Sequence, residues 1–169
     1  MKKRAYYFVV MMFAGGCLNP PEYPVEPEIR FLSISRTTIS QLDTVRVEFE
    51  FTDGDGDIGK EKPDSVDCNL CHFDSCYRTD WNLYLTDLRL GCIERYMIPY
   101  IPPKGSSDAI SGKINIVING ICCLYPDSSG CVPNVNYPLD TVIYTLQMKD
   151  RAGHLSNKIE LPPIVIQCN

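Results

Sequence analysis

A strict alternation of apolar and polar residues at positions 45–52 constrains the fold of this chain more than any other feature. The run reads Val-Arg-Val-Glu-Phe-Glu-Phe-Thr, so that every second side chain is valine or phenylalanine. Successive side chains of an extended strand point to opposite faces, whereas a helix brings every third or fourth residue to one face. The run therefore predicts a β-strand that buries one face and exposes the other.

The same period of two recurs further along the chain. At 114–118 three isoleucines share one face, and Val117 is the one apolar residue on the other face. Residues 142–149 alternate again, with Val142, Tyr144, Leu146 and Met148 on one side. No segment carries a capped apolar run of helical period, so these patterns indicate a chain built from strands.

Two irregularities interrupt the pattern of strands. Leucines at 83 and 85 are out of phase with those at 88 and 90, which predicts a bulge at Thr86-Asp87. Pro162-Pro163 cannot donate ladder hydrogen bonds, so it indicates an edge strand or a bulge. About seven strands in about 140 residues predict a single antiparallel β-sandwich of immunoglobulin-like type. The remaining predicted strands are 29–36, 93–101 and 159–167.

The first 16 residues have the three parts of a signal peptide. Lys2, Lys3 and Arg4 give a positive start, and the 12 apolar or small residues that follow end directly before Cys17. Such a stretch is too short to cross a bilayer, which takes about 20 residues. Ala14-Gly15-Gly16-Cys17 resembles the lipobox of bacterial lipoproteins, with Ala14 in place of the usual leucine. The resemblance implies cleavage before Cys17 and its acylation with chains such as palmitate. The alternative is an ordinary signal peptide with Cys17 merely near the cut.

We expect three parts in this chain: a signal peptide at 1–16, a lipid-anchored spacer at 17–28, and the sandwich domain at 29–169. Loss of the leader removes three of the 16 basic residues and leaves 13 against 21 acidic ones, a net charge near −8. That charge disfavours nucleic acid and anionic lipid headgroups as partners. Residues 18–28 contain four prolines and three glutamates, which predicts a stiff, extended spacer between membrane and domain.

Eight cysteines remain when Cys17 is set apart for lipid. An even number in an exported chain favours disulfides, although the sequence does not fix the pairing. Three lie within 68–76 and three within 122–131, both in turn-rich stretches that cross-links would order. Cys122 and Cys123 point to opposite sides of an extended chain, so we expect them to bond different partners. The disulfide candidates are Cys68, Cys71, Cys76, Cys92, Cys122, Cys123, Cys131 and Cys168.

Two other chemistries compete for the first cysteine cluster. Cys68-Asn69-Leu70-Cys71-His72 matches the C-x-x-C-H pattern of c-type haem attachment, which would make the chain an electron-transfer protein. The surroundings lack the helical periodicity of a small c-type cytochrome. Cys68, Cys71, Cys76 and Cys92 have a tolerable spacing for zinc, but a structural zinc site needs thiolates kept reduced.

An acidic loop, residues 53–59, follows the best strand and reads Asp-Gly-Asp-Gly-Asp-Ile-Gly. Carboxylates at every second position of a flexible backbone can converge on one hard cation, and Ca²⁺ takes six to eight oxygen ligands. By analogy with the EF-hand loop, Asp53, Asp55, Asp57 and Asp64 hold the first, third, fifth and twelfth places. Ile58 occupies the glycine position, and flanking helices are absent. The prediction is a strand-borne Ca²⁺ site; the alternative is a solvated hairpin turn.

A second turn, residues 150–157, reads Asp-Arg-Ala-Gly-His-Leu-Ser-Asn. It resembles the Asp-x-Ala-Gly-Asn-x-Ser turn of bacterial immunoglobulin-like and fibronectin-like domains, with His154 in place of asparagine. Together with the leader and the acidic loop, this turn makes the chain similar to small Bacteroidetes-type outer-membrane lipoproteins that carry one such sandwich. The resemblance implies a lipid-anchored location on the outer membrane, facing the cell exterior, and no known chemistry.

Catalysis needs a poised constellation of side chains, and none is evident. His72 and His154 lie in turn segments without a nucleophile motif or a phosphate-binding loop. Trp81, Tyr84, Tyr96 and Tyr100 could line a glycan-binding face, but core or cross-strand packing explains them more simply. The sequence therefore predicts a non-enzymatic, lipid-anchored interaction module with a protein partner in the cell envelope. A glycan-binding lipoprotein and a haem protein are the alternatives.

Overall fold

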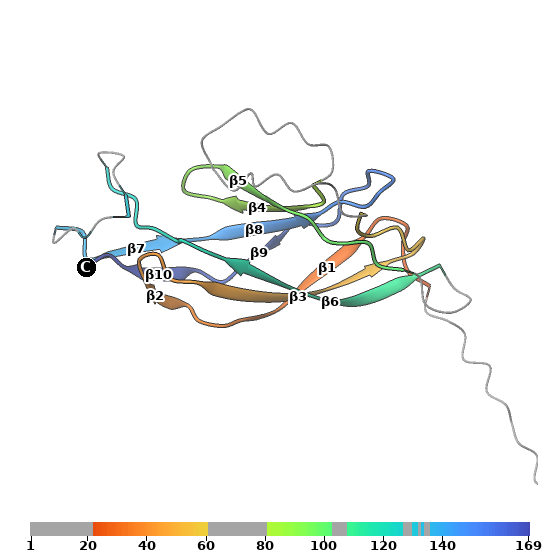
Figure 1. Cartoon of the computed structure of the whole chain (residues 1–169), viewed down its shortest axis with the longest axis horizontal. Coiled ribbons are helices and arrows are strands. Elements are labelled where there is room, and N and C mark those ends of the chain that lie inside the picture. The colour runs from red at the N-terminus through yellow and green to blue at the C-terminus, as the bar shows by residue number, and fades with distance from the viewer. Residues whose placement is uncertain (1–21, 61–80, 103–107, 127–129, 132, 134–135) are drawn as a thin grey trace, which may run out of the picture.

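The computed structural model describes residues 22–60, 81–102, 108–126, 130–131, 133 and 136–169 (Figure 1). These residues form strands and no helix, which confirms the predicted all-β class for the described part of the chain. The strands are β1 (Glu28–Ile34), β2 (Thr38–Ser40), β3 (Val45–Asp53), β4 (Leu83–Asp87), β5 (Cys92–Tyr96), β6 (Ile110–Ile118), β7 (Leu139–Val142), β8 (Tyr144–Met148), β9 (Ile159–Glu160) and β10 (Ile164–Gln167).

The strands form three sheets, in the orders β1-β3-β6, β5-β4-β8-β9 and β2-β10-β7. All pairs are antiparallel except β10 with β2, which is parallel. The four-stranded sheet lies over the β1-β3-β6 sheet, and the third sheet lies toward the end that carries the C-terminus (Figure 1). One cluster of buried side chains joins the three sheets, with contributions from β3, β4, β6, β8 and β10. The core therefore lies between the layers.

Strand β3 has the pattern that the sequence predicts. Val45, Val47, Phe49 and Phe51 are buried, and the residues between them are exposed or half-buried. The strand pairs with β6 over its whole length, from Val45 opposite Ile118 to Asp53 opposite Ile110. On β6, Val117 is 38% exposed, as its place on the polar face predicts. The nine residues of β3 span about 26 Å from the first Cα atom to the last, so this strand runs along much of the β1-β3-β6 sheet.

Three local predictions are wrong. Residues 142–149 form two strands in different sheets, because the chain leaves the β10 edge at Val142 and joins β4 from Tyr144. No bulge interrupts β4 at Thr86-Asp87; both residues pair regularly, and the turn at 88–91 leads into β5. That turn places Leu88 and Leu90 in solvent, 51% and 59% exposed, which explains why these leucines are out of phase.

The third correction concerns the end of the chain. Segment 159–167 is not one strand, since Pro162-Pro163 separates β9 from β10. β9 pairs with β8 at the edge of the four-stranded sheet, whereas β10 is the central strand of the third sheet. Proline has no amide hydrogen to donate, so the pair of prolines marks the point where the chain changes sheets.

Candidate functional site

The acidic loop begins where β3 ends beside β6. Asp53 is the last residue of β3 and is fully buried. Its Oδ2 atom accepts a hydrogen bond from the amide of Asp57 at 2.9 Å, which curls the loop over the end of the strand. Gly56 has a φ of 70°, and a Cβ atom there would lie 1.9 Å from the carbonyl oxygen of Asp108. Only glycine fits this position, because a side chain meets both strain and a backbone atom.

Three carboxylates converge in this loop. One oxygen from each of Asp53, Asp55 and Asp57 lies within 4.8 Å of the other two. Asp53 is buried, Asp57 is half-buried and Asp55 is exposed, so the cluster extends from the core to the surface. The Oδ1 atoms of Asp53 and Asp57 are buried and accept no hydrogen bond from any described residue. Buried polar atoms normally have a partner, so these two oxygens require an explanation.

The electrostatics of the cluster disfavour three bare negative charges. Burial raises the pKa of Asp53 to about 6, and the charges of Asp55, Asp57 and Asp150 act in the same direction, against the hydrogen bond from the Asp57 amide. Burial also raises the pKa of Asp57, against the hydrogen bond from the Ala152 amide. Like charges this close favour a proton or a cation among them.

The 150–157 turn packs against the acidic loop and holds Asp57. The amide of Ala152 donates to Asp57 Oδ2 at 2.8 Å, and the amide of Arg151 donates to the Asp57 carbonyl oxygen at 3.2 Å. The guanidinium of Arg151 donates to the carbonyl oxygen of Gly59 at 3.1 Å and lies over the ring of Tyr100, 5.0 Å from its centroid. The guanidinium of Arg151 is thus engaged by main-chain carbonyls and an aromatic ring.

Asp150 organises this turn from within. It is 2% exposed, and its Oδ1 atom accepts hydrogen bonds from the amides of Gly153 at 2.6 Å and His154 at 2.7 Å. Its Oδ2 atom lies 2.8 Å from Nδ1 of His154. The hydrogen bond to Asp150, and then the charge of that carboxylate, raise the pKa of His154. Both oxygens of Asp150 are therefore used within its own turn.

The predicted ligand set is partly assembled. Asp53, Asp55 and Asp57 lie together, and Asp64 lies outside the described residues. The missed residue is Asp150, whose charge acts on both Asp53 and Asp57 from a distant part of the sequence. Its place at the start of the Asp-x-Ala-Gly turn indicated a role in local structure. That place gave no indication that its charge acts on the acidic loop.

The end of the predicted spacer lies at the same site. The Gly54 amide donates to the carbonyl oxygen of Pro24 at 2.8 Å, and Pro27 is buried. Ile29 exchanges two hydrogen bonds with the side chain of Asn157, at 2.7 and 2.9 Å. Spacer, acidic loop and 150–157 turn therefore meet at one end of the domain, which we call the spacer end.

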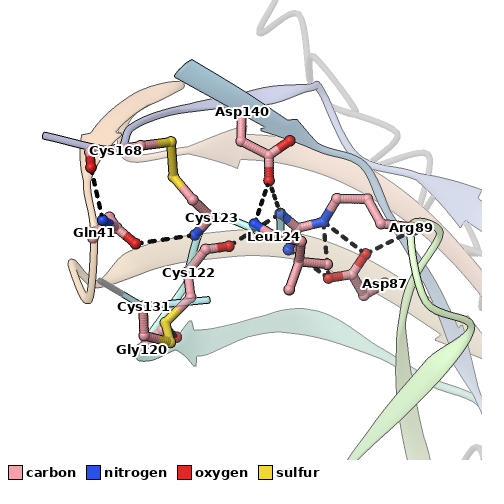
Figure 2. The surroundings of a disulfide bond; sticks show 10 residues. All are labelled: Gln41, Asp87, Arg89, Gly120, Cys122, Cys123, Leu124, Cys131, Asp140 and Cys168. Carbon is pink, nitrogen blue, oxygen red and sulfur yellow. Dashed lines mark hydrogen bonds and ion pairs between the residues drawn. A yellow bond between two sulfur atoms is a disulfide. The ribbon is translucent and has the colours of Figure 1, made fainter. Parts of the chain in front are cut away.

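The opposite end carries two disulfides and is called the stapled end. Cys122 bonds Cys131, and Cys123 bonds Cys168 (Figure 2). This confirms that adjacent Cys122 and Cys123 have different partners. Gln41 bridges the second disulfide, because its side chain donates to the Cys168 carbonyl oxygen at 3.0 Å and accepts from the Cys123 amide at 3.3 Å. Cys68, Cys71, Cys76 and His72 lie outside the described residues, as does Cys17; Cys92 is the first residue of β5.

Arg89 ties the stapled end to the 88–91 turn (Figure 2). Its guanidinium pairs with Asp87 at 2.7 Å and with Asp140 at 2.6 Å, and it donates to the carbonyl oxygen of Cys122 at 3.0 Å. Asp140 also accepts from the amide of Leu124 at 2.9 Å. The three charged side chains are mostly buried, so this network is structural and orders the chain around the disulfides.

The aromatic residues considered for glycan binding have separate neighbours. The hydroxyl of Tyr84 donates to the Trp81 carbonyl oxygen at 2.9 Å, and the hydroxyl of Tyr96 donates to Glu94 at 2.8 Å. Tyr100 lies beneath Arg151. The three tyrosine side chains thus each have a structural contact, whereas Trp81 contributes its main-chain carbonyl and its buried indole nitrogen has no hydrogen-bond partner among the described residues.

Within the described ranges, no helix is long and apolar enough to cross a membrane. Comparison with models of known protein families and with curated protein sequences finds no match to this chain.

Proposed function

We propose that this chain is a lipid-anchored, non-enzymatic interaction module of the outer cell envelope, attached through an acylated Cys17 and folded as an immunoglobulin-like sandwich. The lipobox-like leader supports the anchor, and the two disulfides support an oxidising compartment outside the cytoplasm. The facing antiparallel sheets with one shared core support the sandwich. As a small Bacteroidetes-type lipoprotein, it would face the cell exterior.

The observation that carries this proposal is the opposite placement of the spacer and the disulfides along β3. The spacer contacts Gly54, one residue after β3, whereas Gln41 and Cys168 lie beyond the other end of that strand. The two ends are about 26 Å apart. A domain tethered through its spacer end therefore directs its stapled end away from the membrane (Figure 1).

The stapled end exposes apolar side chains on a rigid frame. Leu42 is 61% exposed, Leu139 60% and Tyr137 46%. Leu42 also has a φ of 63°, a conformation that costs a leucine about 1 kcal/mol or more. Its amide donates to the carbonyl oxygen of Ile121 at 2.9 Å, next to the disulfides. An exposed apolar side chain in a strained, fixed position suits contact with a protein partner.

Photo-crosslinking in cells tests this function. A crosslinking amino acid replaces Leu42 or Leu139 at the stapled end, and Leu155, 51% exposed in the 150–157 turn, is the matched control. We expect the same discrete protein adduct from the first two positions and none from Leu155. Adducts of equal yield at all three positions, or none at any, would contradict a partner at the stapled end.

The anchor has its own test. A Cys17→Ala variant should no longer incorporate labelled palmitate. It should also move from the membrane fraction to the soluble fraction after the cells are fractionated. Retention of the label in this variant would place the lipid on another residue and reject the proposed attachment.

A further inference from the structure

The acidic loop contains a buried carboxylate oxygen that has no partner among the described residues. Asp53 is fully buried; its Oδ2 atom binds the Asp57 amide, and no described residue donates to its Oδ1 atom. An acceptor left unpaired in this way destabilises the fold, and a charged acceptor does so more strongly. The same holds for Oδ1 of Asp57, whose Oδ2 atom is held by Ala152. The loop therefore presents fixed acceptors to a ligand that the described residues do not supply.

The surroundings favour a cation as this ligand. The charges that act most strongly on Asp53 and Asp57 all come from other carboxylates, those of Asp55 and Asp150 included. The guanidinium of Arg151 donates to the carbonyl oxygens of Ile58 and Gly59 instead. A solvated hairpin turn, the alternative for this sequence, would leave its carboxylates in water and would not bury Asp53.

The spacing fits one calcium ion. Oxygens on opposite sides of a Ca²⁺ ion are about 4.6–5.2 Å apart, since each Ca–O distance is about 2.3–2.6 Å. The three carboxylates each offer an oxygen within 4.8 Å of the others, so all three can reach one ion without movement of the backbone. Exposed Asp55 gives the ion a path from solvent and leaves room for water ligands. Zinc prefers nitrogen and sulfur ligands, and Mg²⁺ demands a tighter octahedron than a glycine-rich loop imposes.

We propose that Asp53, Asp55 and Asp57 form a binding site for one Ca²⁺ ion, completed by water, at the spacer end of the domain. The ion joins the last residue of β3 to Asp57, which the 150–157 turn holds through Ala152. It thereby fixes the loop that the Ala152 hydrogen bond attaches to the distant 150–157 turn. Gly54 lies between Asp53 and Asp55, and its amide donates to the carbonyl oxygen of Pro24. The ion therefore also fixes the loop against the spacer.

Calorimetric titration of the purified full-length protein in detergent, after treatment with EDTA, tests the site with CaCl₂ as the only ligand. We expect binding of one Ca²⁺ per chain and a rise in Tm that EDTA reverses. Asp55→Asn should weaken binding at least tenfold without loss of the fold, because Asp55 is exposed. Asp53→Asn should also weaken Ca²⁺ binding at least tenfold, and it should keep the fold because the asparagine side-chain oxygen can still accept from the Asp57 amide. Asp43→Asn, which removes one negative charge at the stapled end, is the matched control and should bind like wild type.

Three results would overturn the site. The first is wild-type protein that gives neither binding heat nor a shift in Tm. The second is an Asp55→Asn variant that binds Ca²⁺ as tightly as the Asp43→Asn control. The third is an equal response to MgCl₂ at the same concentration, which would reject Ca²⁺ as the ion. None of these results bears on the crosslinks at the stapled end, so this proposal and the proposed function can fail separately.

Discussion

The two disulfides should differ in their contribution to stability, although they start at adjacent residues. Cys122 and Cys131 are separated by nine positions, whereas Cys123 and Cys168 are separated by 45. A cross-link restricts the unfolded chain more when it closes a longer loop. The second disulfide also joins the chain after β6 to the residue after β10, so its loop contains β7 and β10 of the third sheet. We expect it to be the stronger of the two.

The loop lengths set the size of the difference. The chain-entropy relation gives about 2.5 kcal/mol for the nine-residue separation and about 4 kcal/mol for the 45-residue one. Burial adds to the second value, because Cys123 and Cys168 are both 0% exposed and their replacement by alanine leaves a cavity. Cys131 is exposed, so its replacement leaves no cavity. The expected gap between the two variants is therefore at least about 1.5 kcal/mol.

Urea unfolding of two double variants measures this gap. Cys122→Ala/Cys131→Ala and Cys123→Ala/Cys168→Ala each remove one disulfide and leave no unpaired sulfur from that pair. The free energy of unfolding should fall more for the second variant, and its m-value should rise more because the unfolded chain expands further. Peptide mapping by mass spectrometry must show the remaining disulfide unchanged in each variant. Equal losses, or a larger loss for Cys122→Ala/Cys131→Ala, would refute the argument from loop length and burial.

Three further changes test other parts of the fold by urea unfolding. Gly56→Ala should cost more than Gly91→Ala; both glycines have positive φ, but a Cβ at Gly56 meets a backbone oxygen and one at Gly91 meets nothing within 4 Å. Burial raises the pKa of Glu94, so the folded state loses stability as the pH rises from the unfolded pKa of this group through its folded pKa, and Glu94→Gln should remove this loss. Arg89→Met should cost about 2–3 kcal/mol, since it strands two mostly buried aspartates, whereas Arg30→Met at an exposed pair should cost less than about 1 kcal/mol.

The alternation of residues was enough to predict which side chains are buried, as β3 and β8 illustrate. Phe49 and Leu146 are both 0% exposed, and each lies on the apolar side of a period-two run. The pattern carries no information about which sheet a strand joins. Val142 and Tyr144 are both buried and in phase, yet the first pairs in one sheet and the second in another. Sheet membership depends on strands elsewhere in the chain, so the split at Ile143 could not be predicted locally.

The turn at 88–91 shows a second limit of the same kind. Leucine is common in cores, so an out-of-phase pair of leucines favoured a bulge that would return both to the buried face. The chain instead turns, and Leu88 and Leu90 face solvent. What holds this turn is Arg89 between them, through ion pairs with Asp87 and with Asp140 of β7. Asp140 lies in a distant segment, so no local pattern could identify this contact.

The acidic loop has one feature that the local sequence predicts and one that depends on a distant segment. Its ligand spacing is local, so the sequence predicted that Asp53, Asp55 and Asp57 converge, and the structure brings them together. The position of Asp57 depends on the 150–157 turn, where Asp150 accepts hydrogen bonds from the amides of Gly153 and His154 and the Ala152 amide donates to Asp57. The turn thus adds the negative charge of Asp150 and a hydrogen bond to the Asp57 carboxylate, whereas its Arg151 guanidinium donates to the carbonyl oxygens of Ile58 and Gly59. Asp53 is buried and Asp57 half-buried, and no described residue forms an ion pair with either. Folding and the proposed binding of Ca²⁺ should therefore be linked, and the ion should stabilise the spacer end more than the stapled end.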